Sequence, residues 1–178
     1  FDAIGDYSPG TFNLAASEMP ESNSIIKIFG VPFQFPDKTD GVLNNILCMG
    51  DLISISTGNY SALYILGVSV NGSYEEPLIL HYSDQSQDTM NLALSDWCGQ
   101  PQYGELPAIT ASYRQMRTDD REPTENHLWL QSIIIDTSRE LVAVQLSNSQ
   151  SLHIFSLTVC KGEAINLSRI IIPKKENA

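Results

Sequence analysis

The sequence predicts an all-β protein, an antiparallel β-sandwich with a jelly-roll-like arrangement of about 8–10 strands. No segment sustains the 3.6-residue apolar period of an amphipathic helix. Short runs rich in β-branched and aromatic residues recur about every ten residues, and turn-forming residues separate them. Because the chain shows neither an internal repeat nor a domain boundary, its 178 residues (1–178) are expected to form a single domain.

The chain begins with a segment in which Gly, Pro and Ser are frequent, so residues 1–24 are expected to be an irregular lead-in laid over the sheet. A first strand is predicted at Ile25–Phe29. Gly30 and Pro32 interrupt it, and Phe33–Phe35 continues the alternation. Pro32 favours an edge strand or a bulge, because proline cannot donate a hydrogen bond to a ladder.

The middle of the chain contains the clearest strand patterns. Asp40–Gly50 is predicted to be a loop or a short helical turn, and Asp51–Ser56 alternates as a strand. Tyr60–Val70 is apolar on both faces, which is typical of a central strand covered on both sides. Asn71-Gly72 then predicts a hairpin turn with positive φ at both residues, and Pro77–Tyr82 is its returning strand.

The later strands are separated by a long irregular region that follows Glu105 and in which Ala108–Tyr113 is a candidate short strand. Asn148–Ser151 is predicted to be a turn. Residues 161–178 are expected to trail, with Ile170–Ile172 as a last strand or held by whatever lies downstream. The other predicted strands are Met90–Ser95, His127–Asp136, Leu141–Leu146 and Leu152–Val159.

The charge balance is strongly acidic: 10 Lys and Arg stand against 21 Asp and Glu, a net charge of −11. Such a surface repels phosphate backbones and anionic headgroups, so nucleic-acid binding and membrane-surface binding are not expected. No apolar run approaches the roughly 18–20 residues of a membrane span.

The chain has three cysteines, Cys48, Cys98 and Cys160, and an odd number excludes a fully paired intramolecular framework. Two alternatives remain: one disulfide with one free thiol, or three buried thiols. In either case we expect at least one buried thiol. No C-x-x-C spacing indicates zinc or a redox pair. No cofactor is expected, and a structural calcium ion stays open although no D-x-D-x-D loop is present. The histidines lack metal-ligand spacing and are expected to be strand residues; they are His81, His127 and His153.

The densest set of polar and aromatic side chains lies in Leu92–Glu105, where a predicted strand ends in a loop. Loops held by a sheet often carry binding sites, and aromatic faces with planar amides and carboxylates suit a carbohydrate. The candidate ligand-binding residues are Asp96, Trp97, Gln100, Gln102, Tyr103 and Glu105. The structural alternative is that Asp96 satisfies loop amides and that Trp97 packs beneath the loop. For Trp129, core packing is favoured.

Catalysis is not expected. The chain contains no G-x-S-x-G, H-E-x-x-H, P-loop or G-x-G-x-x-G motif. A glycosidase that uses Asp96 with Glu105 is the minority hypothesis, because such chemistry needs two carboxyl groups about 5–9 Å apart.

Four segments in order resemble a β-sandwich domain that is attached to secreted glycoside hydrolases. They are Gly30–Asp37 (GVPFQFPD), Tyr60–Gly67 (YSALYILG) followed by Asn71-Gly72, Leu94–Trp97 (LSDW) and Leu152–Val159 (LHIFSLTV). The resemblance covers about residues 25–160 and implies a jelly-roll-like, galactose-binding-type sandwich that accompanies enzymes acting on glycans.

From this resemblance we expect a non-catalytic module, extracellular or in the secretory pathway, that recognises carbohydrate or supports a glycan-active enzyme. In that family the domain sits beside a catalytic domain, and these 178 residues contain nothing long enough to be one. The alternative is a structural domain that docks a neighbouring domain or a partner protein. An exposed apolar face, formed by residues such as Ile170–Ile172, would favour this alternative.

Overall fold

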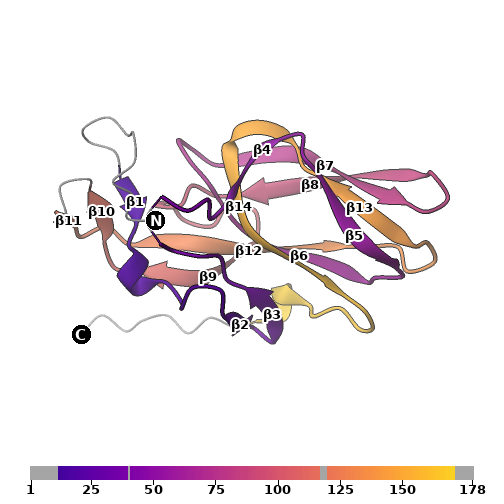
Figure 1. Ribbon diagram of the computed structural model, residues 1–178, viewed down its shortest axis with the longest axis horizontal. Coiled ribbons are helices and arrows are strands. Elements are labelled where there is room, and N and C mark those ends of the chain that lie inside the picture. Colours follow the sequence, from indigo (N-terminus) through magenta and orange to yellow (C-terminus); the bar gives the residue numbers. More distant parts are fainter. Residues whose placement is uncertain (1–11, 40, 117–119, 171–178) are drawn as a thin grey trace.

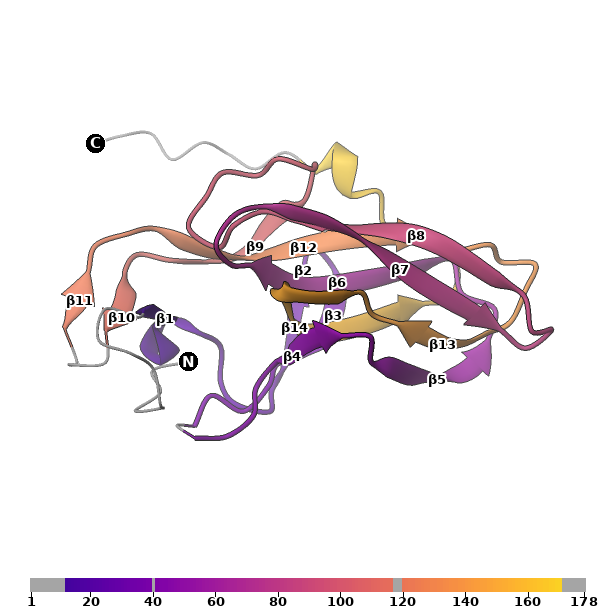
Figure 2. The same ribbon diagram turned by 90° about the horizontal axis from the view of Figure 1, so that it is seen from above.

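A computed structural model describes residues 12–39, 41–116 and 120–170, and its centre is two antiparallel sheets packed face to face (Figures 1 and 2). The five-stranded sheet contains, in spatial order, β4 (Ile46–Met49), β14 (Asn148–Cys160), β6 (Ala62–Ser69), β12 (Asn126–Ile134) and β9 (Leu106–Ala111). The four-stranded sheet contains β5 (Leu52–Gly58), β13 (Leu141–Gln145), β7 (Tyr74–Tyr82) and β8 (Gln87–Leu94).

The order of these strands is that of a jelly roll. Eight of them are divided four and four between the sheets, in the orders β4-β14-β6-β12 and β5-β13-β7-β8, and β9 extends the first sheet. The sheets enclose one apolar core that takes residues from both, such as Ile65 of β6 and Leu80 of β7. The predicted all-β antiparallel sandwich is therefore confirmed.

Smaller elements flank the sandwich. Those at one end are β1 (Phe12–Leu14), β10 (Arg114–Met116) and β11 (Arg121–Glu122), which form a small sheet, and the 3-10 helix η1 (Ala16–Glu18). The others are the hairpin of β2 (Ile25–Ile28) and β3 (Val31–Gln34) and a second 3-10 helix, η2 (Leu167–Arg169). The lead-in is thus not wholly irregular, because β1 pairs with β10. Pro32 lies on a two-stranded sheet, as its edge-strand prediction requires.

The central strand β6 is buried along its whole length, as its apolar pattern predicts. Its inner face contributes to the core between the sheets. Its outer face, with Tyr64 and Leu66, packs against a second cluster that includes Phe33 of the β2–β3 hairpin and Leu167 of η2. The five-stranded sheet is therefore covered on both faces, and a strand inside it has no polar alternation.

The hairpin prediction at Asn71-Gly72 is wrong in its pairing. Both residues have positive φ, 61° and 129°, as predicted. However, β14 and β12 occupy both edges of β6, so the chain crosses to the other sheet and β7 pairs with β13 and β8. The tight two-residue hairpin turn is at Phe29-Gly30, with φ of 49° and 89°, where the sequence predicted an interrupted strand.

Other strand boundaries also differ. The predicted loop Asp40–Gly50 contains β4, and the predicted turn Asn148–Ser151 is the start of β14, whose first residues pair with β4. Ile171 and Ile172, which the sequence offered as part of a last strand, lie outside the described residues. Trp129 is fully buried, which confirms its core assignment.

Candidate functional site

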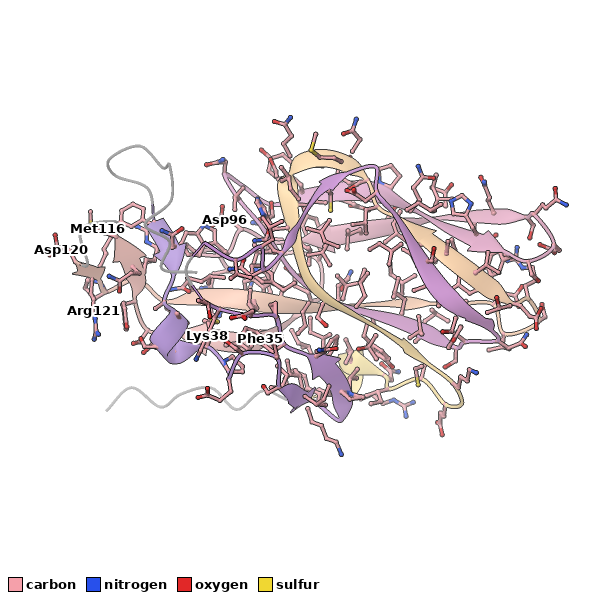
Figure 3. The ribbon with its side chains drawn as sticks, viewed as in Figure 1. Phe35, Lys38, Asp96, Met116, Asp120 and Arg121 are labelled. Atoms are coloured by element: carbon pink, nitrogen blue, oxygen red, sulfur yellow. The ribbon has the colours of Figure 1, made fainter. Side chains whose placement is uncertain are left out.

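The predicted site begins where β8 ends and the chain reaches across to the five-stranded sheet. Ser69 and Asp96 form an isolated parallel bridge. The amide of Ser69 donates to Ser95 O (3.1 Å), and the amide of Trp97 donates to Ser69 O (2.9 Å). The amide of His127 donates to Trp97 O (2.7 Å), so Asp96 and Trp97 are held between β6 and β12. Figure 3 shows Asp96 on the side of the sandwich that lies near Met116 and Arg121.

The carboxylate of Asp96 binds backbone amides on two segments. Its Oδ2 accepts a hydrogen bond from the amide of Gly72 (2.9 Å), and its Oδ1 accepts one from the amide of Cys98 (2.9 Å). Its own amide donates to Ser73 Oγ (3.0 Å). The aspartate therefore joins the β6–β7 crossover to the loop after β8, which is the structural alternative considered from the sequence.

Glu105 is used in the same way and is 2% exposed. Its Oε1 accepts hydrogen bonds from the amides of Ser95 (3.1 Å) and Gln102 (3.4 Å), and its Oε2 accepts one from the amide of Tyr103 (2.8 Å). Hydrogen bonds from several amides satisfy the buried carboxylate and join the two ends of the loop. The contacts give Glu105 a role in closing the loop.

The other four predicted site residues keep some surface. Gln100 and Gln102 are exposed, while Trp97 and Tyr103 are partly exposed. Trp97 also packs against the main core, and the guanidinium of Arg114 lies 5.8 Å from its ring centroid. The structure therefore brings the six residues into one loop but separates their roles: two carboxylates hold it, and two aromatics and two amides form its surface.

Cys98 lies in this loop, where burial raises the pKa of its thiol and the nearby Arg114 opposes the increase. Cys48, Cys98 and Cys160 are all free thiols, and Cys48 is fully buried, as expected of at least one cysteine. Among residues 12–39, 41–116 and 120–170, no three His, Cys, Asp or Glu side chains gather in a way that could hold a metal ion.

A second site, which the sequence did not predict, is an apolar groove at the edge of the sandwich between β5 and β14. Its volume is about 400 Å³. Ile53 comes from β5, Ile46 from β4 and Ile154 from β14. The complete lining is Pro36, Leu43, Asn44, Asn45, Ile46, Ile53, Ile154, Phe155, Ser156 and Leu157.

Most of the exposed large apolar residues lie in and around β4, and two of them, Leu43 and Ile46, line this groove. Of the large apolar side chains that are exposed in the described parts of the chain, all but Ile25 and Ile134 lie between residues 42 and 52. We call them the β4–β5 apolar segment: Val42, Leu43, Ile46, Met49 and Leu52. Leu43 is 95% exposed, and β4 and β5 are edge strands of their sheets. Natural edge strands are usually protected by charge or proline, so this segment is a candidate interaction surface.

The comparison with protein families matches residues 1–163 to the family described as the AziU2-like beta-sandwich domain. That match covers 163 of the 178 residues. The chain belongs to this family. No curated protein matches the chain. The family description confirms the β-sandwich in the resemblance drawn from the sequence; it does not extend to an association with glycoside hydrolases.

Sequence reasoning missed the groove of this AziU2-like domain because the groove depends on how β4, β5 and β14 end relative to one another. One signal was present in the chain. Six large apolar residues fall in Val42–Leu52, although most of that stretch was predicted to be a loop. Apolar residues in a predicted loop indicate either a hidden strand or an interaction surface, and here part of the stretch forms the strand β4.

Proposed function

We propose that this AziU2-like domain is a non-catalytic module that binds a partner protein through the groove and the β4–β5 apolar segment. The observation that carries the proposal is the exposure of that segment, with Leu43 at 95%, Met49 at 59% and Leu52 at 60%, together with the position of Leu43 and Ile46 in the lining of the groove. Fully burying one such side chain contributes about 1.5–3 kcal/mol, so covering part of the segment would stabilise a complex substantially.

The loop after β8 supports a non-catalytic role. The carboxylates of Asp96 and Glu105, the pair considered for glycosidase chemistry, accept hydrogen bonds from loop amides. A general acid or nucleophile must instead reach the scissile bond. Screening chromogenic glycosides at high protein concentration tests this part of the proposal, and turnover that Glu105→Gln abolishes would contradict it.

The docking role is tested by selecting displayed peptides on the folded domain. Selected sequences are then titrated against the wild type, the Leu43→Ser/Ile46→Ser double variant and the Ile134→Ser variant. Ile134 is a matched control because it is 62% exposed and lies on β12. We expect the double variant to bind about tenfold more weakly and Ile134→Ser to bind like the wild type. Selected sequences that bind all three proteins equally would overturn the proposal.

Carbohydrate recognition by the β8–β9 loop is the second candidate function, favoured by its surface residues Trp97, Gln100, Gln102 and Tyr103. A partly exposed indole next to exposed amides suits the apolar and polar faces of a sugar ring. A glycan array followed by calorimetry tests it. Binding that Gln100→Ala/Gln102→Ala weakens would support this candidate, whereas no binding to any glycan would remove it.

The location proposed with either function is the extracellular space or the secretory pathway, as the sequence resemblance implies. None of the described helices is long and apolar enough to cross a membrane.

A further inference from the structure

The five-stranded sheet has an incomplete edge beside the groove. β14 is 13 residues long, whereas its neighbour β4 has only 4 residues. Their ladder ends at the pair Ile154 and Ile46. From Ser156 to Cys160, β14 pairs with β6 on one side. On the other side, no strand of the described parts of the chain forms a ladder with it. The β3 residue Pro32 reaches this stretch through the hydroxyl of Thr158, which donates to its carbonyl oxygen (2.6 Å).

The first two residues of this stretch border the apolar groove, and Thr158–Cys160 lie beside Gly30–Pro32 of the β2–β3 hairpin. Ser156 and Leu157 line the groove together with Ile46 and Ile53. Leu157 and Val159 are opposite Ile65 and Leu63 of β6, on the face of the sheet that packs into the main core, and both remain partly exposed. A strand placed along Ser156–Cys160 would therefore direct alternate side chains toward an apolar surface that already exists.

The charge distribution indicates the chemistry of an added strand. Between residues 39 and 113, which include β4 and β5, the chain has no Lys or Arg and eight acidic residues. They are Asp40, Asp51, Glu75, Glu76, Asp84, Asp88, Asp96 and Glu105. Because the whole chain has a net charge of −11, a partner segment that carries Lys or Arg is attracted to the domain, whereas a second copy with the same charge is repelled.

We infer that the partner protein contributes an extended segment that pairs with Ser156–Cys160 as an added strand, with aliphatic side chains in the groove alternating with Lys or Arg. The inference rests on the proposed docking function and deepens it. Main-chain hydrogen bonds to an open sheet edge give such a complex its affinity, and pockets for alternate side chains give it specificity. The fold offers both features at one place.

The test uses a short synthetic peptide in which Val and Lys alternate, and two control peptides. One control is N-methylated at alternate residues, so that it lacks the amides needed for a ladder, and the other has Glu in place of Lys. Amide hydrogen exchange of the domain is measured with each peptide. We expect the first peptide to slow exchange of the Ser156–Cys160 amides by at least about tenfold, and both controls to have little effect.

Three outcomes would overturn the inference. In the first, the peptide binds the wild type and not the Leu43→Ser/Ile46→Ser variant, but the exchange of the Ser156–Cys160 amides is not slowed. Strand addition is then wrong, while the docking function stands. Equal binding of the N-methylated peptide leads to the same conclusion. If sedimentation shows that the domain dimerises through this edge, the added strand comes from a second copy of the chain and not from a partner protein. If neither this peptide nor any displayed peptide distinguishes the wild type from the double variant, the docking function itself fails.

Discussion

The indole Nε1 of Trp129 donates a hydrogen bond to the carbonyl oxygen of Asp96 over 3.2 Å. Trp129 is fully buried in β12, whereas Asp96 lies in the loop after β8. The bond therefore fixes that loop to the centre of the sandwich, and the Asp96 carboxylate continues the connection to Gly72. A loop selected from the sequence as the best ligand site is thus also a fastening between the two sheets.

Replacing Asp96 should loosen this connection. Asp96→Ala removes the acceptor for the amides of Gly72 and Cys98, and we expect the free energy of unfolding to fall by about 1–3 kcal/mol. Asp84→Ala is the control, because Asp84 binds only the nearby Ser86 in an exposed turn, and its effect should be below about 1 kcal/mol. Urea denaturation of both variants measures the difference; equal losses would contradict the fastening role.

Gly67→Ala should destabilise the sandwich because β6 leaves no space for a side chain there. A Cβ at this position would lie 2.9 Å from the carbonyl oxygen of His153 and 2.8 Å from Leu94 Cδ1. We expect a loss of about 1–3 kcal/mol in thermal or urea unfolding. Gly58→Ala is the control. A Cβ at Gly58 would lie 3.2 Å from the flexible end of the Lys161 side chain, which can move, so this variant should change stability much less. A neutral Gly67→Ala would show that β6 and β14 can separate at no cost.

The cysteines should differ in reactivity. Burial removes Cys48 from solvent and raises the pKa of its thiol to about 11, so at pH 8 only about one molecule in a thousand carries the thiolate. Cys160 is partly exposed. Titration with a disulfide reagent should therefore label Cys160 in the folded protein and Cys48 only after denaturation. Labelling of both at one rate would contradict the buried position of Cys48.

Acid should weaken the fold through His127 and His153. Burial lowers the pKa of His153 and of His127 below the ordinary value of 6.5, although Glu125 opposes the shift of His127. As the pH falls through about 6.5, the unfolded chain takes up protons that the native state resists, so stability decreases. Urea midpoints measured from pH 8 to pH 5 should fall, and they should fall less for His153→Gln. A variant profile identical to that of the wild type would assign the loss to other groups.

The local sequence pattern predicted the positions of several strands and the backbone conformation of one turn. The two-sided apolar run predicted β6, period-two alternation predicted β5, and Asn71-Gly72 predicted two residues with positive φ. Pairing could not be predicted in the same way, since the crossover after Asn71-Gly72 follows from β14 and β12 occupying the edges of β6.

The candidate site was likewise predictable only in the features that depend on local sequence. The composition of Leu92–Glu105 correctly drew attention to a structured loop, but the amides that Asp96 and Glu105 bind belong partly to distant segments such as Gly72. The groove was missed because it results from a short β4 beside a long β14, a difference in length that appears only when the strands are paired.

The most direct test of the docking function is a chemical-shift map of the ¹⁵N-labelled domain titrated with the tightest selected peptide. The largest shifts should fall on Leu43–Ile46, Ile53 and Ile154–Leu157, the residues that line the groove. Amides of Trp97–Tyr103, in the loop after β8, should change little. Shifts confined to that loop, or shifts that persist unchanged in Leu43→Ser/Ile46→Ser, would contradict docking at the groove.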